Sequence, residues 1–251
     1  MKAVVVGGTG AVGREIVLQL LASDKWATVT TVGRRPLDAA AAAAESTAAN
    51  ARALALSSSA LQKLRHVDAP DVTDPPAAAF AGADAVFCAL GTTRGDAGSA
   101  EAFLRVDLHG VEAAVRAAST AAPGASKPRF FGVVSASGAN SALPAPHFVG
   151  LHPLLYSQAK GAAEDAVRAG GFESASAWRP GLLARGHKAR AIERVLAVLP
   201  VVPRIRVADV ARVAVADAER CLSSGGARGW RTYDMLSLLS AARKEPAAAP
   251  K

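Results

Sequence analysis

The stretch Gly7-Gly8-Thr9-Gly10-Ala11-Val12-Gly13 decides how this chain folds, because it joins a predicted strand to a predicted helix. Before it, Lys2–Gly7 is a short run rich in valine, and after it Ala11–Ser23 carries apolar residues at helical spacing. Glycines at this junction permit a tight turn, contact between the backbone and a pyrophosphate, and close packing of the helix on the strand. The start of the helix then offers free N–H groups to the phosphates. The stretch therefore predicts a dinucleotide-binding loop.

The rest of the chain continues the alternation of strand and helix. Near-continuous apolar strands joined by helices indicate a parallel sheet covered on both faces. We expect an α/β protein, a doubly wound parallel Rossmann sheet with a small C-terminal cap, forming one domain over residues 1–251. Residues from about 180 to 240 are expected to form the cap on the substrate side, and the tail 241–251 to fray. The further strands that we expect are Ala27–Val32, Leu64–Val67, Ala85–Leu90, Phe130–Ser135 and Ser174–Trp178. The expected helices are Pro75–Ala83, Ala100–Ala118, Leu154–Ala169, Ala189–Val198, Val207–Leu222 and part of Leu37–Ala60.

Composition excludes several classes of protein. With 51% hydrophobic residues among 251, global disorder is excluded, because that much apolar surface must be buried. The two cysteines, Cys88 and Cys221, make a disulfide framework improbable and favour a reducing compartment. No run reaches the roughly 18–20 apolar residues of a bilayer crossing, and the N-terminus has no secretory or transit pattern. We expect a soluble cytoplasmic protein, with the nucleus or an organelle surface as alternatives.

The chain is basic, with a formal net charge of +8, and seven of its basic residues lie between 179 and 206. The interpretation we favour is a solvated basic face; an anionic ligand or an anionic membrane surface is the alternative. No aromatic residues interleave with these charges to stack on bases, so we expect no nucleic-acid partner. The histidines are scattered, and we expect no metal site.

The tip of the second strand indicates which dinucleotide binds. A site for NAD carries an acidic residue there to accept from the adenosine ribose. This chain instead has Arg34 and Arg35 after Gly33, and guanidinium groups pair well with a 2′-phosphate. We therefore predict NADP(H) as the cofactor. Asp68, at the end of the third strand, is placed either to accept from the adenine amino group or to serve as a turn residue.

Tyr156 and Lys160 are four residues apart in a predicted helix, so they lie on one face of it. Reduction of a carbonyl by hydride builds negative charge on the oxygen, which a phenol positioned as general acid protonates. An ammonium group nearby favours the phenolate form of a phenol and also binds ribose hydroxyls. Ser135 and Ser137, at the end of the fifth strand, are the candidates for orienting the carbonyl oxygen.

The glycine loop, Tyr156-x-x-x-Lys160 and Arg179-Pro180-Gly181 together resemble the atypical, extended-type short-chain dehydrogenase/reductases. The run Cys88-Ala-Leu-Gly-Thr-Thr-Arg-Gly95 and Arg105-Val106-Asp107 are similar to the HIV Tat-interactive oxidoreductase family, over residues 2 to about 215. The resemblance implies that Tyr156 is the proton donor and that NADPH contacts Thr9, Gly10, Ala11, Val12, Arg34, Arg35, Leu90, Gly91, Lys160 and Leu183. Gly7, Gly13, Asp68 and Pro180 complete the expected cofactor contacts.

Two departures from the dehydrogenase pattern leave alternatives open. Asp107 stands where many short-chain dehydrogenases have a catalytic asparagine. Ser137 fits the extended-type spacing, whereas Ser135 fits the alignment with the family. The prediction is an oxidoreductase acting on a small carbonyl substrate; the alternative is an NADPH-binding regulatory module with little turnover and with protein partners, as the resemblance implies.

Overall fold

The computed structural model describes residues 1–50, 56–92, 94–120, 126–144, 152–184 and 203–244. Its centre is a seven-stranded sheet in the order β3-β2-β1-β4-β5-β6-β9, and every neighbouring pair is parallel. The strands are β1 (Lys2–Val6), β2 (Thr28–Gly33), β3 (Leu64–Asp68), β4 (Ala85–Cys88), β5 (Phe130–Val134), β6 (Ser174–Trp178) and β9 (Gly229–Tyr233). The strand order reverses between β1 and β4, and open α/β sheets bind ligands at such a point, beyond the carboxyl ends of the strands.

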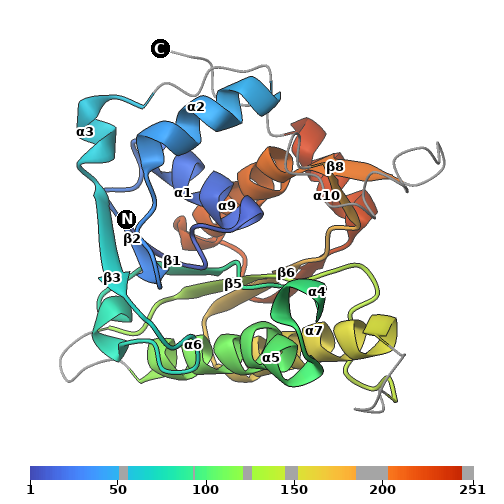
Figure 1. The fold of residues 1–251 in the computed structure, drawn as a ribbon. Coiled ribbons are helices and arrows are strands. Elements are labelled where there is room, and N and C mark those ends of the chain that lie inside the picture. Colours follow the sequence, from blue (N-terminus) through green and yellow to red (C-terminus); the bar gives the residue numbers. More distant parts are fainter. Residues whose placement is uncertain (51–55, 93, 121–125, 145–151, 185–202, 245–251) are drawn as a thin grey trace.

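Helices cover both faces of the sheet (Figure 1). On one side lie α1 (Ala11–Ala22), α2 (Ala39–Asn50) and α9 (Val207–Leu222); on the other lie α5 (Ala100–Leu104), α6 (Gly110–Ser119) and α7 (His152–Ala169). Short helical segments complete the connections: α3 (Ser58–Leu61), η1 (Ala77–Phe80) and α4 (Arg94–Ala97). The doubly wound parallel sheet expected from the sequence is confirmed.

The sheet is held by two apolar clusters, one on each face. Because side chains alternate along a strand, Phe87 packs with Trp26 and Trp178 on the α1 side, while its neighbour Val86 packs on the α6 side. Gly132 in β5 leaves room for the Trp178 ring, since a Cβ at Gly132 would lie 2.0 Å from it. The continuous apolar strands in the sequence reflect this burial on both faces.

Only part of the region expected to form a cap lies outside the central fold. The helix α9 packs against α1, and β9 is the seventh strand of the main sheet, so both belong to the central fold rather than to a cap. What lies outside the central sheet is a two-stranded sheet of β7 (Leu182–Ala184) and β8 (Arg204–Arg206), together with α10 (Met235–Lys244). The sequence analysis predicted neither β9 nor α10.

The expectation of fraying from residue 241 also needs correction. The helix α10 continues to Lys244, because Ala241 and Ala242 pack against the core and the carbonyl of Ala242 accepts from Arg212. Residues 245–251, and the helix expected over Ala189–Val198, lie outside the described residues.

The long helix expected over Ala100–Ala118 is interrupted. Between α5 and α6 the chain forms one π-helical turn, η2 (Arg105–His109), with Asp107 fully buried at its centre. Such turns widen a helix by one residue and occur often at functional sites.

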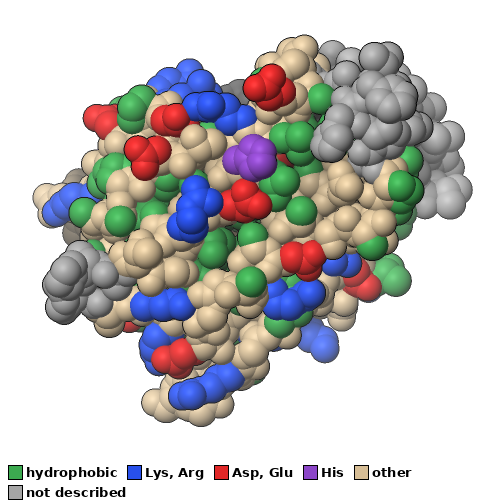
Figure 2. All heavy atoms as spheres, turned by 90° about the horizontal axis from the view of Figure 1, so that it is seen from below, with side chains coloured by type: hydrophobic (Ala, Val, Ile, Leu, Met, Phe, Trp, Pro, Cys, Tyr) green, Lys and Arg blue, Asp and Glu red, His purple; other side chains and the backbone are tan. Residues whose placement is uncertain are grey.

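Figure 2 shows the face that α5, α6 and α7 cover, and acidic and basic side chains are interspersed on it. No helix in the described ranges has both the length and the apolar composition that a bilayer crossing requires. Most of the basic segment 179–206 lies outside the described residues, so its expected solvation stays a prediction.

Candidate functional site

The glycine-rich loop lies between β1 and α1, at the point where the strand order reverses. Gly7 has a φ of 81°, a conformation that glycine adopts without strain. A Cβ at Gly13 would lie 2.2 Å from the carbonyl oxygen of Gly7, so only glycine fits where the helix meets the loop. Val12 is buried in the core beside this contact, whereas Thr9 and Gly10 are exposed and Ala11 is partly so.

These features fit a dinucleotide diphosphate. Gly10 is the N-cap of α1, makes no side-chain cap hydrogen bond, and no acidic residue lies in the first turn. Among the described residues no side chain caps this helix start, so its backbone N–H groups and the positive end of the helix dipole suit a phosphate group.

The tip of β2 presents Arg34 and Arg35, both exposed. Within the described part of the chain, neither guanidinium forms a hydrogen bond or an ion pair. Asp68 ends β3 directly beside Gly33. Its carboxylate is 84% exposed and lies 3.2 Å from Nε2 of His66. The three residues that sequence analysis assigned to the adenosine end of a cofactor are thus brought to one corner of the sheet.

The helix α7 carries Tyr156 and Lys160 on one face, as their spacing predicts. Tyr156 is partly buried, with its ring 6.0 Å from that of Phe103. Lys160 is 3% exposed, and its ammonium group donates to the carbonyl of Leu90 at 3.2 Å, just after β4. The expected contact residues Leu90 and Gly91 therefore lie against Lys160; a Cβ at Gly91 would be 3.4 Å from Nζ.

Asp107 forms a buried ion pair with Lys160. Its Oδ1 lies 2.9 Å from Nζ, and its Oδ2 accepts from the backbone N–H of Thr92 at 2.7 Å. Burial, the largest single effect, lowers the pKa of Lys160, but the carboxylate of Asp107, together with Tyr156 and Cys88, acts in the opposite direction, and the pKa is raised overall. The aspartate therefore holds the ammonium charged and ties the loop after β4 to it.

The two candidate serines have different surroundings. Ser135 is buried, and its hydroxyl donates to the carboxylate of Glu164 on α7. Ser137 is exposed and its hydroxyl donates to the carbonyl of Arg179 at 3.2 Å. Only Ser137 is therefore accessible to a substrate.

The loop that follows Ser137 packs directly on α7. Asn140 donates its backbone N–H to the carbonyl of Ser157 at 2.9 Å, and a Cβ at Gly161 would lie 2.1 Å from the backbone nitrogen of Ser141. Glycine after Lys160 thus permits the close approach that brings the end of β5 to the helix carrying Tyr156.

Pro180 is buried, and its carbonyl accepts from the backbone N–H of Ser137 at 3.0 Å. Leu183, in β7, packs against the same core cluster as Ala11 and Ala89, which flank the glycine loop and the end of β4. All the expected site residues thus lie at or near the carboxyl end of the sheet.

Sequence reasoning missed Glu164, which lies one further helical turn beyond Lys160. It is 1% exposed and binds both Nε and an Nη of Arg179, at 2.8 and 2.6 Å, in addition to Ser135. These bonds raise the pKa of Arg179. The spacing Tyr-x-x-x-Lys-x-x-x-Glu was the available signal, since it places all three side chains on one helix face.

A parallel sheet with a glycine loop at its first strand–helix junction defines a dinucleotide-binding α/β protein. The model of a family described as NAD(P)H-binding matches residues 7–220. The chain belongs to this NAD(P)H-binding family.

The chain is similar in sequence to several curated proteins. The chain is 31% identical to "Protein FMP52, mitochondrial" of Candida albicans over 183 residues, which are 73% of this chain and 67% of that protein. It is also 31% identical to "Protein HTATIP2" of Rattus norvegicus over 179 residues, which are 71% of this chain and 61% of that protein.

Solved structures share the fold. A short-chain type dehydrogenase/reductase from Mycobacterium ulcerans aligns with a TM-score of 0.60 and 19% identity, over 95% of this chain and 90% of that one. Yeast methylglyoxal/isovaleraldehyde reductase Gre2, complexed with NADPH, aligns with a TM-score of 0.62 and 17% identity, over 92% and 78%.

Proposed function

We propose that this chain is an NADPH-dependent oxidoreductase that reduces a small carbonyl substrate, with Tyr156 as the proton donor. The observation that supports the proposal is that Lys160, on the same face of α7 as Tyr156, donates to the carbonyl of Leu90 just after β4, while the exposed Ser137 follows β5, on which α7 packs. Bound NADPH would supply the hydride. In this proposal the substrate side is covered by β7, β8 and α10, and residues 1–251 act as one domain.

Side chains of the protein orient the substrate, donate the proton and bind the cofactor. Ser137 orients the carbonyl oxygen, and Tyr156 protonates it as negative charge develops. The Lys160 ammonium group has three N–H donors. Within the described residues, one N–H donates to the carbonyl of Leu90 and a second faces the carboxylate of Asp107. The third is directed to the ribose hydroxyls of the cofactor in this proposal. The buried thiols of Cys88 and Cys221 are free and suit a reducing compartment, for which we propose the cytoplasm.

Replacing Tyr156 by phenylalanine tests the proposal. We expect kcat to fall by at least about 100-fold, because a positioned general acid contributes about 10²–10⁴-fold, while the Kd for NADPH changes by less than about twofold, since the phenyl ring remains. Steady-state reduction over a panel of aldehydes and ketones, with NADPH binding followed by fluorescence, measures both. Ser135→Ala is the matched control, since it removes a hydroxyl that Glu164 holds away from solvent. Turnover retained by Tyr156→Phe ends the assignment.

A second function, an NADPH-binding regulatory module with little turnover, is favoured by one observation. The charge of Lys160 is balanced inside the protein by Asp107, where an asparagine would leave it unbalanced. That balance weakens the attraction of Lys160 for a developing phenolate. Tight NADPH binding without oxidation of NADPH by any member of the panel identifies this function.

The choice of NADPH over NADH rests on Arg34 and Arg35. We expect Arg34→Ala/Arg35→Ala to raise the KM for NADPH at least tenfold, because hydrogen bonds to a charged group contribute about 1.5–3 kcal/mol each. The KM for NADH, which lacks the 2′-phosphate, is expected to change by less than about twofold. Arg243→Ala/Lys244→Ala, at the exposed end of α10, removes the same number of positive charges and is the matched control. An equal rise for both cofactors contradicts the assignment.

A further inference from the structure

Met235 and Ser137, which 98 positions separate in the sequence, both lie close to Gly181. It is the first residue of α10 and follows β9 directly after Asp234. Its sulfur lies 3.4 Å from the backbone nitrogen of Gly181. A Cβ built on Gly181 would lie 3.4 Å from Oγ of Ser137 and 3.7 Å from Sδ of Met235. The face of Gly181 that lacks a side chain is therefore turned towards both Ser137 and Met235.

The position of Met235 is fixed by the end of β9. The backbone N–H of Arg179 donates to the carbonyl of Tyr233 at 2.8 Å, which holds the two strand ends in register. Asp234 then starts α10, since its carboxylate accepts from the backbone N–H of Ser237 at 2.7 Å; this hydrogen bond lowers its pKa. The methionine thus directly follows a strand end and a helix cap that are each held by a hydrogen bond.

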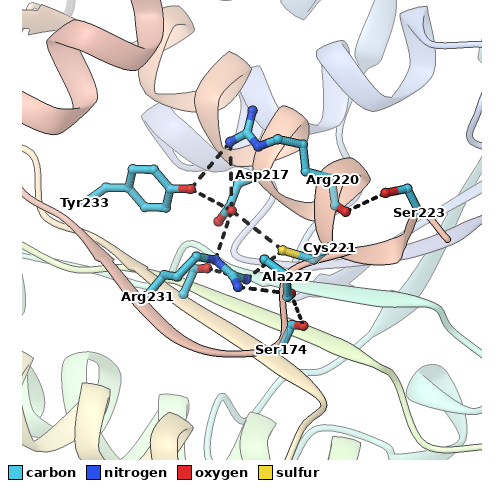
Figure 3. Close-up of polar contacts among 9 residues, drawn as sticks. Ser174, Asp217, Arg220, Cys221, Ser223, Ala227, Arg231 and Tyr233 are labelled. Atoms are coloured by element: carbon cyan, nitrogen blue, oxygen red, sulfur yellow. Dashed lines mark hydrogen bonds and ion pairs between the residues drawn. The ribbon is translucent and has the colours of Figure 1, made fainter. Parts of the chain in front are cut away.

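A buried polar cluster anchors β9 to α9 (Figure 3). Asp217 of α9, 1% exposed, accepts from the hydroxyl of Tyr233 at 2.8 Å and lies 3.3 Å from Nε of Arg231. Arg231 also donates to Sγ of Cys221 and to the carbonyl of Ala227. Two side chains of β9 are therefore tied to one carboxylate, which explains how a strand with polar residues holds its place at the sheet edge.

The charged groups beside Met235 are already bound. The guanidinium of Arg179 is held by two hydrogen bonds to Glu164, and the carboxylate of Asp234 is the cap of α10. A thioether is apolar, unbranched and adaptable, and it packs well on aliphatic and aromatic groups.

We propose that Met235 forms an apolar wall beside Ser137 and so selects carbonyl substrates that carry an aliphatic or aromatic group, over small or anionic ones. The inference rests on the proposed function, because Ser137 is taken to hold the carbonyl oxygen. It adds the chemical class of the substrate and the residue that sets it.

The kinetic test compares three aldehydes: hexanal, which carries an aliphatic chain, propanal, which is small, and glyoxylate, which is anionic. We expect the wild-type protein to prefer hexanal, and Met235→Ala to lower the ratio of kcat/KM for hexanal over propanal by about tenfold, the effect of losing one or two methylene contacts in an apolar pocket. Met235→Leu, which keeps the volume, should restore most of the ratio. Leu236→Ala is the matched control, because Leu236 is adjacent but 71% exposed. An unchanged ratio in Met235→Ala overturns the inference.

A second readout does not need turnover. The chain has two methionines, so methyl-¹³C methionine labelling gives two NMR signals, and Met235→Leu identifies the one from Met235. Hexanamide is a carbonyl compound that hydride does not reduce, and we expect it to shift the Met235 signal of the NADPH-loaded protein to saturation, with a smaller shift from acetamide. A Met235 signal that hexanamide leaves unmoved overturns the inference. A shifted signal in a protein that reduces no carbonyl supports the apolar wall and rejects the proposed function alone.

Discussion

Asp107→Ala is expected to lower the free energy of unfolding by about 3–5 kcal/mol, the cost of removing one partner from a buried ion pair. Asp107 is fully buried, Lys160 is 3% exposed, and their charged atoms are 2.9 Å apart. Without the carboxylate, the ammonium remains in the interior with the Leu90 carbonyl as its hydrogen-bond acceptor among the described residues. The backbone N–H of Thr92 loses its acceptor as well. Urea unfolding followed by circular dichroism measures the change.

The control is the double variant Asp107→Ala/Lys160→Met. Replacing both members of a buried pair by apolar groups is far less costly than removing one, since no uncompensated charge is left. We therefore expect the double variant to recover at least half of the lost stability. A double variant no more stable than Asp107→Ala means that the pair is not what holds this part of the fold.

Gly13→Ala is expected to lower the stability by about 3 kcal/mol, at the upper end of the usual cost of overpacking, and to weaken NADPH binding by more than about tenfold. The added methyl group would lie 2.2 Å from the carbonyl oxygen of Gly7. That oxygen accepts from the backbone N–H of Gly10, so moving it distorts the whole loop. A displaced loop no longer directs its N–H groups at the diphosphate. Thermal unfolding and a fluorescence titration with NADPH measure the two effects.

Gly33→Ala provides the comparison for this variant. Gly33 ends β2 close to the expected cofactor, but a Cβ there would meet nothing within 4 Å. We expect its melting temperature and NADPH affinity to stay close to those of the wild type. Equal losses in the two variants would show that the close approach at Gly13 is not the cause.

Most of the central fold follows from local patterns. Six of the strands were predicted near their observed positions, because each is a short run bounded by turn residues, and most residues of β1, β4, β5 and β6 are buried. The strand β9, Gly-Trp-Arg-Thr-Tyr, was missed because it lies at the edge of the sheet and carries polar side chains. Its stability comes from Asp217 on a distant helix, and no local pattern reports such a contact.

The candidate site was likewise predicted from local patterns only in part. Tyr156 and Lys160 follow from helical spacing, and the glycine loop follows from its place between a strand and a helix. Which serine is accessible did not follow, because Ser135 and Ser137 lie two residues apart and differ only in what packs against them. The contact between Asp107 and Lys160 depends on a π-helical turn and on the packing of that turn against α7.

The sequence by itself determined the class of fold, the loop that fits a diphosphate, and the face of α7 that carries Tyr156 and Lys160, because each depends on residues within one or two turns of each other. Only the tertiary structure decided that Asp107 balances Lys160, that Glu164 holds Ser135 and Arg179, and that Met235 and Ser137 lie at the same face of Gly181. These contacts join residues between 15 and 98 positions apart, and their formation depends on how the helices pack on the completed sheet.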